Sequence, residues 1–201
     1  MLFQFPILMW ENLSNYKIVL GSQSPRRVEL LRGLDLTFEQ RVLPDLDETY
    51  PDGLPLEEIP RYIAARKAEA YFPSLEPNTL LITADTLVFL KGQVLGKPKD
   101  GEEAKAMLHR LAGERHYVTT GVAICVAGKV HSFMDTATVD FLPLTGEEIS
   151  YYVERYSPLD KAGAYGIQEW VGYAGISRIE GSFYTVMGLP VHLISKYLKT
   201  L

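Results

Sequence analysis

The chain has 201 residues, of which 47% are hydrophobic and 22% are charged, and its formal net charge is -5 at pH 7. Enough apolar side chains are present to build a core, which excludes a disordered chain. The acidic balance argues against a dedicated binder of nucleic acid or of a membrane surface. The single cysteine, Cys125, excludes an intramolecular disulfide, and its place in an apolar run predicts that it is buried.

Residues 1–16 are predicted to be an N-terminal extension outside the folded domain, with residues 1–8 either disordered or upstream of a true start at Met9. Their apolar stretch has no preceding Lys or Arg and is interrupted by Pro6, unlike a secretory signal peptide. No run in the sequence approaches the roughly 20 apolar residues of a membrane span. We therefore expect a cytoplasmic protein without a membrane partner.

The first half of the chain is predicted to alternate short strands with helices. Strands are expected at 17–20, 38–43 and 79–84, and helices at 25–31 and 56–72. Ser24 as N-cap and Pro25 in the first helical position mark the start of the first helix. The run 79–84 is continuously apolar, which is typical of a central strand buried on both faces, and we expect it to end at Asp85.

The second half is predicted to contain a hairpin across Lys91-Gly92 and two long alternating strands, 116–126 and 130–142, joined by a tight turn. Further elements are expected as capped helices after Asp100 and Thr145, a strand at 176–180 and a helix opened by Pro190. Because the two long strands must pair antiparallel, the sequence predicts an α/β protein with a mixed sheet rather than a doubly wound parallel one.

The start of the first predicted helix is a candidate anion site. Arg26 and Arg27 lie in the first turn, where the helix dipole disfavours positive charge. A bound phosphate would resolve the conflict, because the helix N-terminal amides, the hydroxyls of Ser22 and Ser24 and a guanidinium all donate hydrogen bonds to phosphate. The alternative is a solvated pair of arginines at an ordinary helix start.

Two carboxylates are candidate ligands for a divalent metal. Asp85 follows an apolar strand, and Glu48 lies in an acidic loop; Mg²⁺ commonly takes one or two protein carboxylates together with substrate phosphates. A turn cap and a solvated acidic loop are the respective alternatives. Lys67, Lys97 and Lys161 would supply positive charge to the same ligand, although each alone is typical of a protein surface.

Taken together, these segments resemble the Maf family of septum-formation proteins and nucleoside triphosphate pyrophosphatases. The matching motifs occur in order from about residue 17 to the C-terminus, which makes the set specific. They are Ser22 to Arg27, Asp47-Glu48, Lys67-Ala68, Ala84-Asp85-Thr86, Gly96-Lys97-Pro98, Leu111-Ala112-Gly113, Thr120-Gly121-Val122, Pro158 to Gln168, Gly181-Ser182 and Gly188-Leu189-Pro190. Gly21 and Ala112 depart from the residues usual in the family, and neither carries a catalytic group.

The resemblance implies a single domain over residues 17–201, with an elongated mixed sheet flanked by helices and two lobes around a central cleft, as in inosine-triphosphate pyrophosphatases. It implies metal-dependent hydrolysis of a nucleoside triphosphate to the monophosphate and pyrophosphate, with Mg²⁺ or Mn²⁺ as cofactor. Asp85 takes the place of the family's proton acceptor and, with Glu48, of its metal ligands. Ser22, Lys67, Lys97 and Lys161 are then expected to bind substrate.

Three positions assign the sequence to a branch of the family. Arg26, Thr86 and Gln168 match the branch that acts on dTTP and UTP, and we expect them to bind substrate. A Gln amide both donates and accepts, as the edge of uracil or thymine requires; whether Arg26 contacts the base or the phosphates stays open. The alternative function is a non-catalytic nucleotide sensor that regulates cell division through protein partners. The sequence leaves the oligomeric state open, with a homodimer as one expectation.

Overall fold

The structure is a computed structural model that describes residues 9–44 and 46–201. The prediction for residues 1–8 lies outside these ranges. The strands are β1 (Lys17–Leu20), β2 (Glu39–Gln40), β3 (Thr79–Leu90), β4 (Gln93–Leu95), β5 (Arg115–Val126), β6 (Lys129–Phe141) and β7 (Ile176–Glu180). The α-helices are α1 (Pro25–Arg32), α2 (Ile59–Ala70), α3 (Gly101–Leu111), α4 (Gly146–Tyr156), α5 (Trp170–Ala174), α6 (Phe183–Met187) and α7 (Val191–Leu198).

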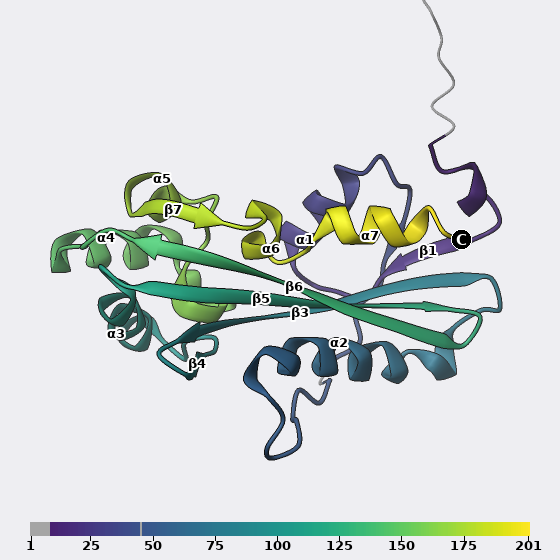
Figure 1. Ribbon diagram of the computed structural model, residues 1–201, viewed down its shortest axis with the longest axis horizontal. Coiled ribbons are helices and arrows are strands. Elements are labelled where there is room, and N and C mark those ends of the chain that lie inside the picture. Colours follow the sequence, from purple (N-terminus) through teal and green to yellow (C-terminus); the bar gives the residue numbers. More distant parts are fainter. Residues whose placement is uncertain (1–8, 45) are drawn as a thin grey trace, which may run out of the picture.

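The described strands form one seven-stranded mixed sheet with the order β2-β1-β3-β5-β6-β7, and β4 pairs with β3 outside this path. β1 pairs parallel with β2 and β3, whereas the pairs β3–β5, β5–β6 and β6–β7 are antiparallel. The long strands β3, β5 and β6 run the length of the molecule (Figure 1). The predicted α/β fold with an elongated mixed sheet is therefore confirmed.

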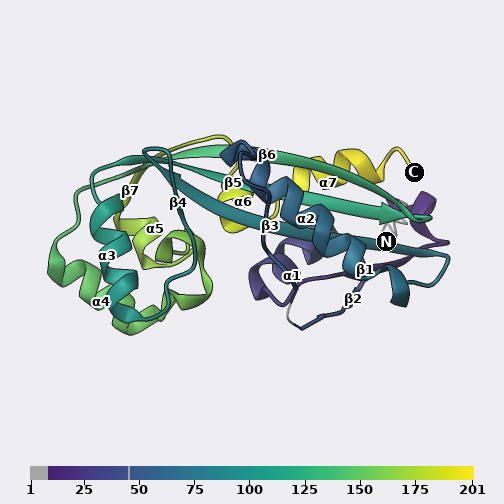
Figure 2. The ribbon, with the colours of Figure 1, turned by 90° about the horizontal axis from the view of Figure 1, so that it is seen from below.

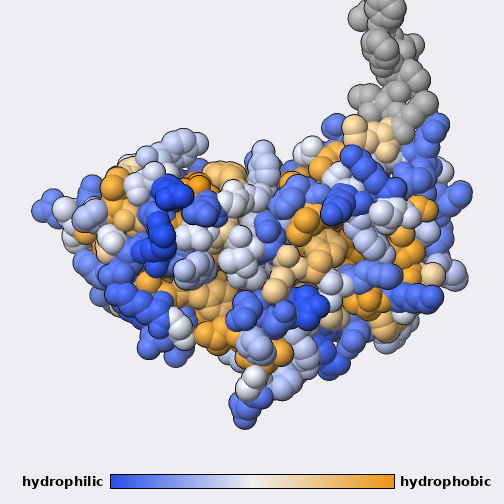
Figure 3. All heavy atoms as spheres, in the orientation of Figure 1, coloured by the Kyte–Doolittle hydropathy of each residue, from blue (hydrophilic) through white to orange (hydrophobic). Residues whose placement is uncertain are grey.

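Helices gather at the two ends of the long strands. α3, α4 and α5 lie at one end, and α1, α2, β1 and β2 lie toward the other, with β3 passing between them (Figure 2). On the face seen in Figure 1, the space-filling view shows hydrophilic residues with hydrophobic residues in patches between them (Figure 3). No helix within residues 9–44 and 46–201 has the length and apolar character that a membrane crossing requires.

Helix α2 packs directly on the sheet, and a glycine makes this possible. A Cβ atom at Gly121 would lie 2.3 Å from the backbone nitrogen of Arg61, so only glycine permits the helix to come so close. Beneath α2 lies a small core that includes the predicted buried thiol of Cys125, which is 1% exposed. Burial raises the pKa of that thiol, as expected for a structural rather than reactive cysteine.

Strand β3 is longer than the sequence predicts. We expected the strand to end before Asp85, but β3 continues to Leu90, because β5 pairs with it along one edge from Leu80 to Phe89. On the other edge β1 pairs only as far as Ile82, and β4 begins to pair at Val88. Among the described strands none pairs with this edge between those two points, so the middle of β3 has an open edge.

Other local predictions hold with small changes. Thr145 forms the expected capping box at α4, and the turn between β5 and β6 has positive φ angles at Ala127 and Gly128. The predicted strand 38–43 is wrong in length, since β2 covers only Glu39–Gln40; β1 ends at Leu20 and offers no further partner. At the described N-terminal end, Trp10 donates to the Leu34 carbonyl at 2.8 Å, so this part of the predicted extension contacts the body.

Candidate active site

A cleft of about 870 Å³ lies at the open edge of β3. Its walls come from the loop after β1, α2, the middle of β3, the loop after β4, the segment 160–168 and α6. All of the site residues predicted from the sequence line it, although they are spread over much of the chain. They are Ser22, Arg26, Glu48, Lys67, Asp85, Thr86, Lys97, Lys161 and Gln168.

The open edge lets side chains from both faces of β3 reach one cleft. Asp85 contacts Lys67 of α2 on one face, whereas Thr86 contacts Thr120 of β5 on the other. Successive residues of a strand point to opposite faces, so these two neighbours could not share a cleft within a fully paired sheet. The extension of β3 beyond Ala84 thus corrects our expectation for Asp85: it lies within a strand and not at its end.

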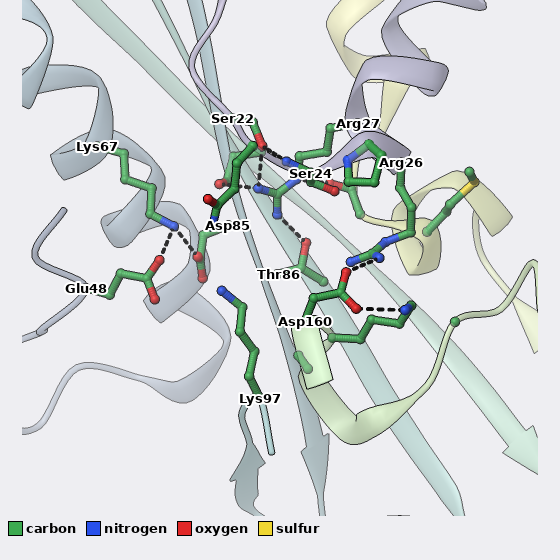
Figure 4. A pocket seen from close by; sticks show the side chains of 18 of the residues that line it. Ser22, Ser24, Arg26, Arg27, Glu48, Lys67, Asp85, Thr86, Lys97 and Asp160 are labelled. Carbon is green, nitrogen blue, oxygen red and sulfur yellow. Dashed lines mark hydrogen bonds and ion pairs between the residues drawn. The ribbon is translucent and has the colours of Figure 1, made fainter. Parts of the chain in front are cut away.

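The charged part of the cleft is centred on Lys67 (Figure 4). Its ammonium lies 2.8 Å from Oδ1 of Asp85 and 2.6 Å from Oε1 of Glu48. Lys67 and Asp85 are both buried, whereas 49% of the Glu48 side chain is exposed. Burial alone would raise the pKa of Glu48, but its hydrogen bond to Lys67 and nearby positive charges, including Lys97, outweigh that effect and lower the pKa.

The two carboxylates fit a divalent metal that also binds substrate. Oδ2 of Asp85 is buried and has no hydrogen-bond partner in the described part of the chain, which leaves this oxygen free to contact a metal or a water molecule. No group of three His, Cys, Asp or Glu residues able to hold a metal occurs among the described residues. A pair of carboxylates completed by phosphate oxygens and water is typical of Mg²⁺, which suits Glu48 and Asp85.

Arg27 is the main residue of this site that the sequence analysis did not separate from its neighbour. Its guanidinium donates to the carbonyls of Ala84 (2.9 Å) and Gly188 (2.9 Å) and to the hydroxyl of Thr86 (3.0 Å). Burial lowers its pKa, and the negative charge of Asp85 opposes that shift. In the sequence, the two arginines in the first turn of a helix indicated a functional site. They did not indicate which of the two points into the cleft.

Arg26 belongs instead to a chain of charges at the far side of the cleft. It lies 2.7 Å from Asp160 (Figure 4). Asp160 also binds Lys161 at 2.8 Å, and Lys161 lies 3.1 Å from Glu169. Asp160 and Glu169 were not predicted from sequence. Asp160 and Glu169 are sequence neighbours of the predicted Lys161 and Gln168. That adjacency is the feature from which they could have been predicted.

The other part of the cleft is mainly apolar. Val88 and Val118, which are cross-strand partners, line it together with Tyr165 and Ile167. Gln168 also lines the cleft, and its Oε1 is buried and has no hydrogen-bond partner within the described residues. A buried acceptor without a partner is a candidate to receive a hydrogen bond from a ligand.

Behind this wall a buried histidine supports Tyr165. Nε2 of His116 lies 2.8 Å from the Tyr165 hydroxyl, and both rings pack edge-on against Phe141. Burial lowers the pKa of His116 to about 4. The imidazole is therefore neutral at pH 7 and packs behind the wall of the cleft.

The fold and site define an α/β protein with a cleft in which two carboxylates and several cations meet. Residues 17–201 match the family model described as Maf-like protein, and the chain belongs to that family. A dTTP/UTP pyrophosphatase of Porphyromonas gingivalis strain W83 is 57% identical over 95% of this chain and 97% of that protein. A dTTP/UTP pyrophosphatase of Parabacteroides distasonis is 55% identical over 95% and 99%, respectively. A solved HAM1 protein from Coxiella burnetii is 15% identical with a TM-score of 0.46, covering 92% of this chain and 100% of that one.

Proposed function

We propose that the protein is a pyrophosphatase that hydrolyses dTTP and UTP to the nucleoside monophosphate and pyrophosphate. The relatives that carry this name match nearly the whole chain at 57% and 55% identity. The observation that carries the proposal is the buried Asp85, whose Oδ1 is held by Lys67 while Oδ2 has no partner in the described chain. An oriented carboxylate with one free oxygen is suited to accept a proton from water.

In the proposed reaction a water oxygen attacks the α-phosphorus of the triphosphate. The bond from that phosphorus to the bridging oxygen breaks, pyrophosphate leaves with the bond electrons, and Asp85 accepts the proton of the water. Lys67 fixes the carboxylate by its 2.8 Å contact. In this proposal Lys97, which points toward the space in front of Asp85, and the Ser22 hydroxyl bind phosphate oxygens (Figure 4).

A divalent cation, Mg²⁺ or Mn²⁺, would neutralise phosphate charge in this reaction, and Glu48 and Asp85 would hold it. Because the Lys67 ammonium contacts both carboxylates, it holds them close together before substrate arrives. The low pKa of Glu48 keeps that carboxylate ionised, as a metal ligand must be.

The apolar part of the cleft is the proposed site of the base. Gln168 has a buried, unpartnered amide oxygen there, which is able to accept from N3–H of uracil or thymine while the amide nitrogen donates to a base oxygen. Arg26 and Lys161 flank this region and are held by Asp160. A base with the wrong donor pattern would leave such buried groups unpaired, which disfavours it.

Pyrophosphate release from UTP, dTTP, CTP, ATP and GTP with Mg²⁺ tests the proposal. We expect UTP and dTTP to be hydrolysed well ahead of ATP and GTP. Release from none of them would refute the enzyme and favour the non-catalytic sensor, whereas preference for GTP or ATP would refute only the base assignment.

We also propose a cytoplasmic enzyme without a nucleic-acid partner. The homodimer stays a prediction, which light scattering would check.

A further inference from the structure

A directed chain of hydrogen bonds crosses from β5 to the charged part of the cleft. The Thr120 hydroxyl lies 2.8 Å from the carbonyl of Thr185, to which it can only donate. It also lies 2.9 Å from the Thr86 hydroxyl, which must therefore be the donor in that contact. Thr86 in turn accepts from Nη2 of Arg27 at 3.0 Å. Each hydroxyl hydrogen of this chain is thus assigned.

Arg27, at the end of this series of hydrogen bonds, donates to a β3 carbonyl on the edge where no described strand pairs. The last bond between β1 and β3 runs from the Gly21 amide to the Ile82 carbonyl. The next carbonyl on that edge, that of Ala84, accepts from Nη1 of Arg27 instead. Because a guanidinium donates in a fixed plane, its orientation also sets its remaining bonds. Thr86 is the side-chain acceptor that holds one end of this plane.

The same guanidinium orients the predicted phosphate-binding hydroxyl. Nη1 of Arg27 lies 3.4 Å from Oγ of Ser22, which also accepts from the Ser24 amide at 3.2 Å. These two donors occupy the lone pairs of the oxygen, so the hydroxyl hydrogen is left to donate, and Ser22 lines the cleft. Arg27 therefore donates in two directions, to Thr86 and through it to Thr120 on one side, and to Ser22 on the other.

We infer that Thr120 is a positioning residue for triphosphate binding, which acts through Thr86 and Arg27 on Ser22. This inference rests on the proposed function of the same cleft. It also changes the role of Thr86, whose hydrogen is committed to Thr120 and is not available to a base. Thr86 then cannot donate a hydrogen bond to a base, and its role in the inference is to hold Arg27.

The test compares Thr120→Val, which keeps the shape and removes the hydroxyl, with Thr120→Ser, which keeps the hydroxyl. Thr120→Val should raise KM for UTP and GTP alike, on the order of tenfold, with kcat changed much less, and Thr120→Ser should restore KM to within about threefold. In the Thr86→Val background, Thr120→Val should add at most about twofold, because the hydroxyl it supports is already gone.

The matched control is Thr119→Val. Thr119 bonds to Thr136 at 2.9 Å, between the same β5 and the neighbouring β6, but neither residue lines the cleft. Thr119→Val should lower the melting temperature and leave KM unchanged. If it raises KM as much as Thr120→Val does, the effect is general loss of stability and the inference is wrong.

Two further results would overturn the inference. The first is wild-type KM in Thr120→Val. The second is a Thr86→Val enzyme in which the ratio of UTP to GTP turnover changes by more than about tenfold, because such a change indicates direct base recognition. The Thr86→Val measurement can be made whether or not the Thr120 variants fold.

Calorimetric binding of inorganic tripolyphosphate separates this inference from the proposed function. We expect affinity about tenfold weaker in Thr120→Val and restored in Thr120→Ser, whether or not the wild type releases pyrophosphate from a nucleotide. Equal affinity in all three proteins would refute the positioning role, and a wild type that hydrolyses no nucleotide would refute the proposed function alone.

Discussion

Around Asp85 the cleft is lined by charged side chains that pair across several segments, whereas around Val88 it is lined by apolar side chains and one amide. Both Asp85 and Val88 lie on β3, and the three residue steps from one to the other span about 10 Å of extended strand. In the charged part, Lys67 is held by two carboxylates at 2.6 and 2.8 Å. In the apolar part, Oε1 of Gln168 has no partner among the described residues.

This difference suits two tasks. Charged groups that take part in a reaction must be held in place before the substrate arrives, because reorganisation would add to the barrier. Selection of a base needs shape and a few unpaired polar groups, which penalise the wrong ligand. If this division is correct, changes in one part should leave the other part working, and the following experiments test that separation.

Removal of metal should have the largest effect. EDTA should abolish pyrophosphate release, and added Mg²⁺ or Mn²⁺ should restore it, since the cleft must otherwise balance a triphosphate with side-chain cations alone. Glu48→Gln should raise the Mg²⁺ concentration for half-maximal rate by about tenfold. Glu57→Gln, an exposed residue outside the cleft, serves as control. Full activity in EDTA would contradict the metal assignment.

Asp85→Asn should lower kcat by roughly 10²–10⁴-fold, because an amide cannot accept the proton of the attacking water. The fold should persist, since Asn keeps the shape and Lys67 retains Glu48 as a partner. Initial rates of pyrophosphate release and circular dichroism together measure this. A variant with a near-normal rate would remove Asp85 from the proposed reaction.

Gln168→Glu should act on the apolar part alone. A carboxylate cannot donate to a base oxygen, so we expect the preference for UTP over GTP to fall by about tenfold. Tripolyphosphate affinity, measured by calorimetry, should stay within about twofold of the wild type, because the charged part is intact. A loss of tripolyphosphate affinity equal to the loss of preference would contradict the division of the cleft.

The smallest expected effect concerns His116, which lies behind Tyr165. Burial lowers the pKa of His116 to about 4 from an ordinary value of 6.5, so below pH 6.5 the unfolded chain binds a proton that the folded protein does not. This contribution to the free energy of unfolding is present above pH 6.5 and is lost as the pH falls toward 4, by about 2 kcal/mol between pH 7 and 5. Urea unfolding at both pH values measures it.

Two histidine variants separate this effect from general acid sensitivity. His116→Gln should reduce the difference in unfolding free energy between pH 7 and 5, because glutamine does not titrate. His109→Gln, at an exposed position of α3, should keep the wild-type difference. Equal pH dependence in both variants would show that His116 titrates in the folded protein as it does in the unfolded chain.

Much of the architecture and all of the predicted site residues were accessible from the sequence because their signals are local. Alternating residues and a tight turn predicted the β5–β6 hairpin, and Thr145 with Glu148 predicted the start of α4. The site residues were found because short motifs occur in a family order, which says that they act together without saying how they touch.

Tertiary structure alone decided the length of β3 and the pairing of the charges. Asp85 looks like the end of a strand in sequence, but hydrogen bonds to β5, more than thirty residues away, extend the strand through it. Likewise, the sequence presented Arg26 and Arg27 as equals, and only the position of β3 and of Gly188 assigned one to the interior and left the other to Asp160. The physical reason is range: propensity, capping and periodicity act within a few residues, whereas an open sheet edge and its ion pairs arise only when distant segments meet.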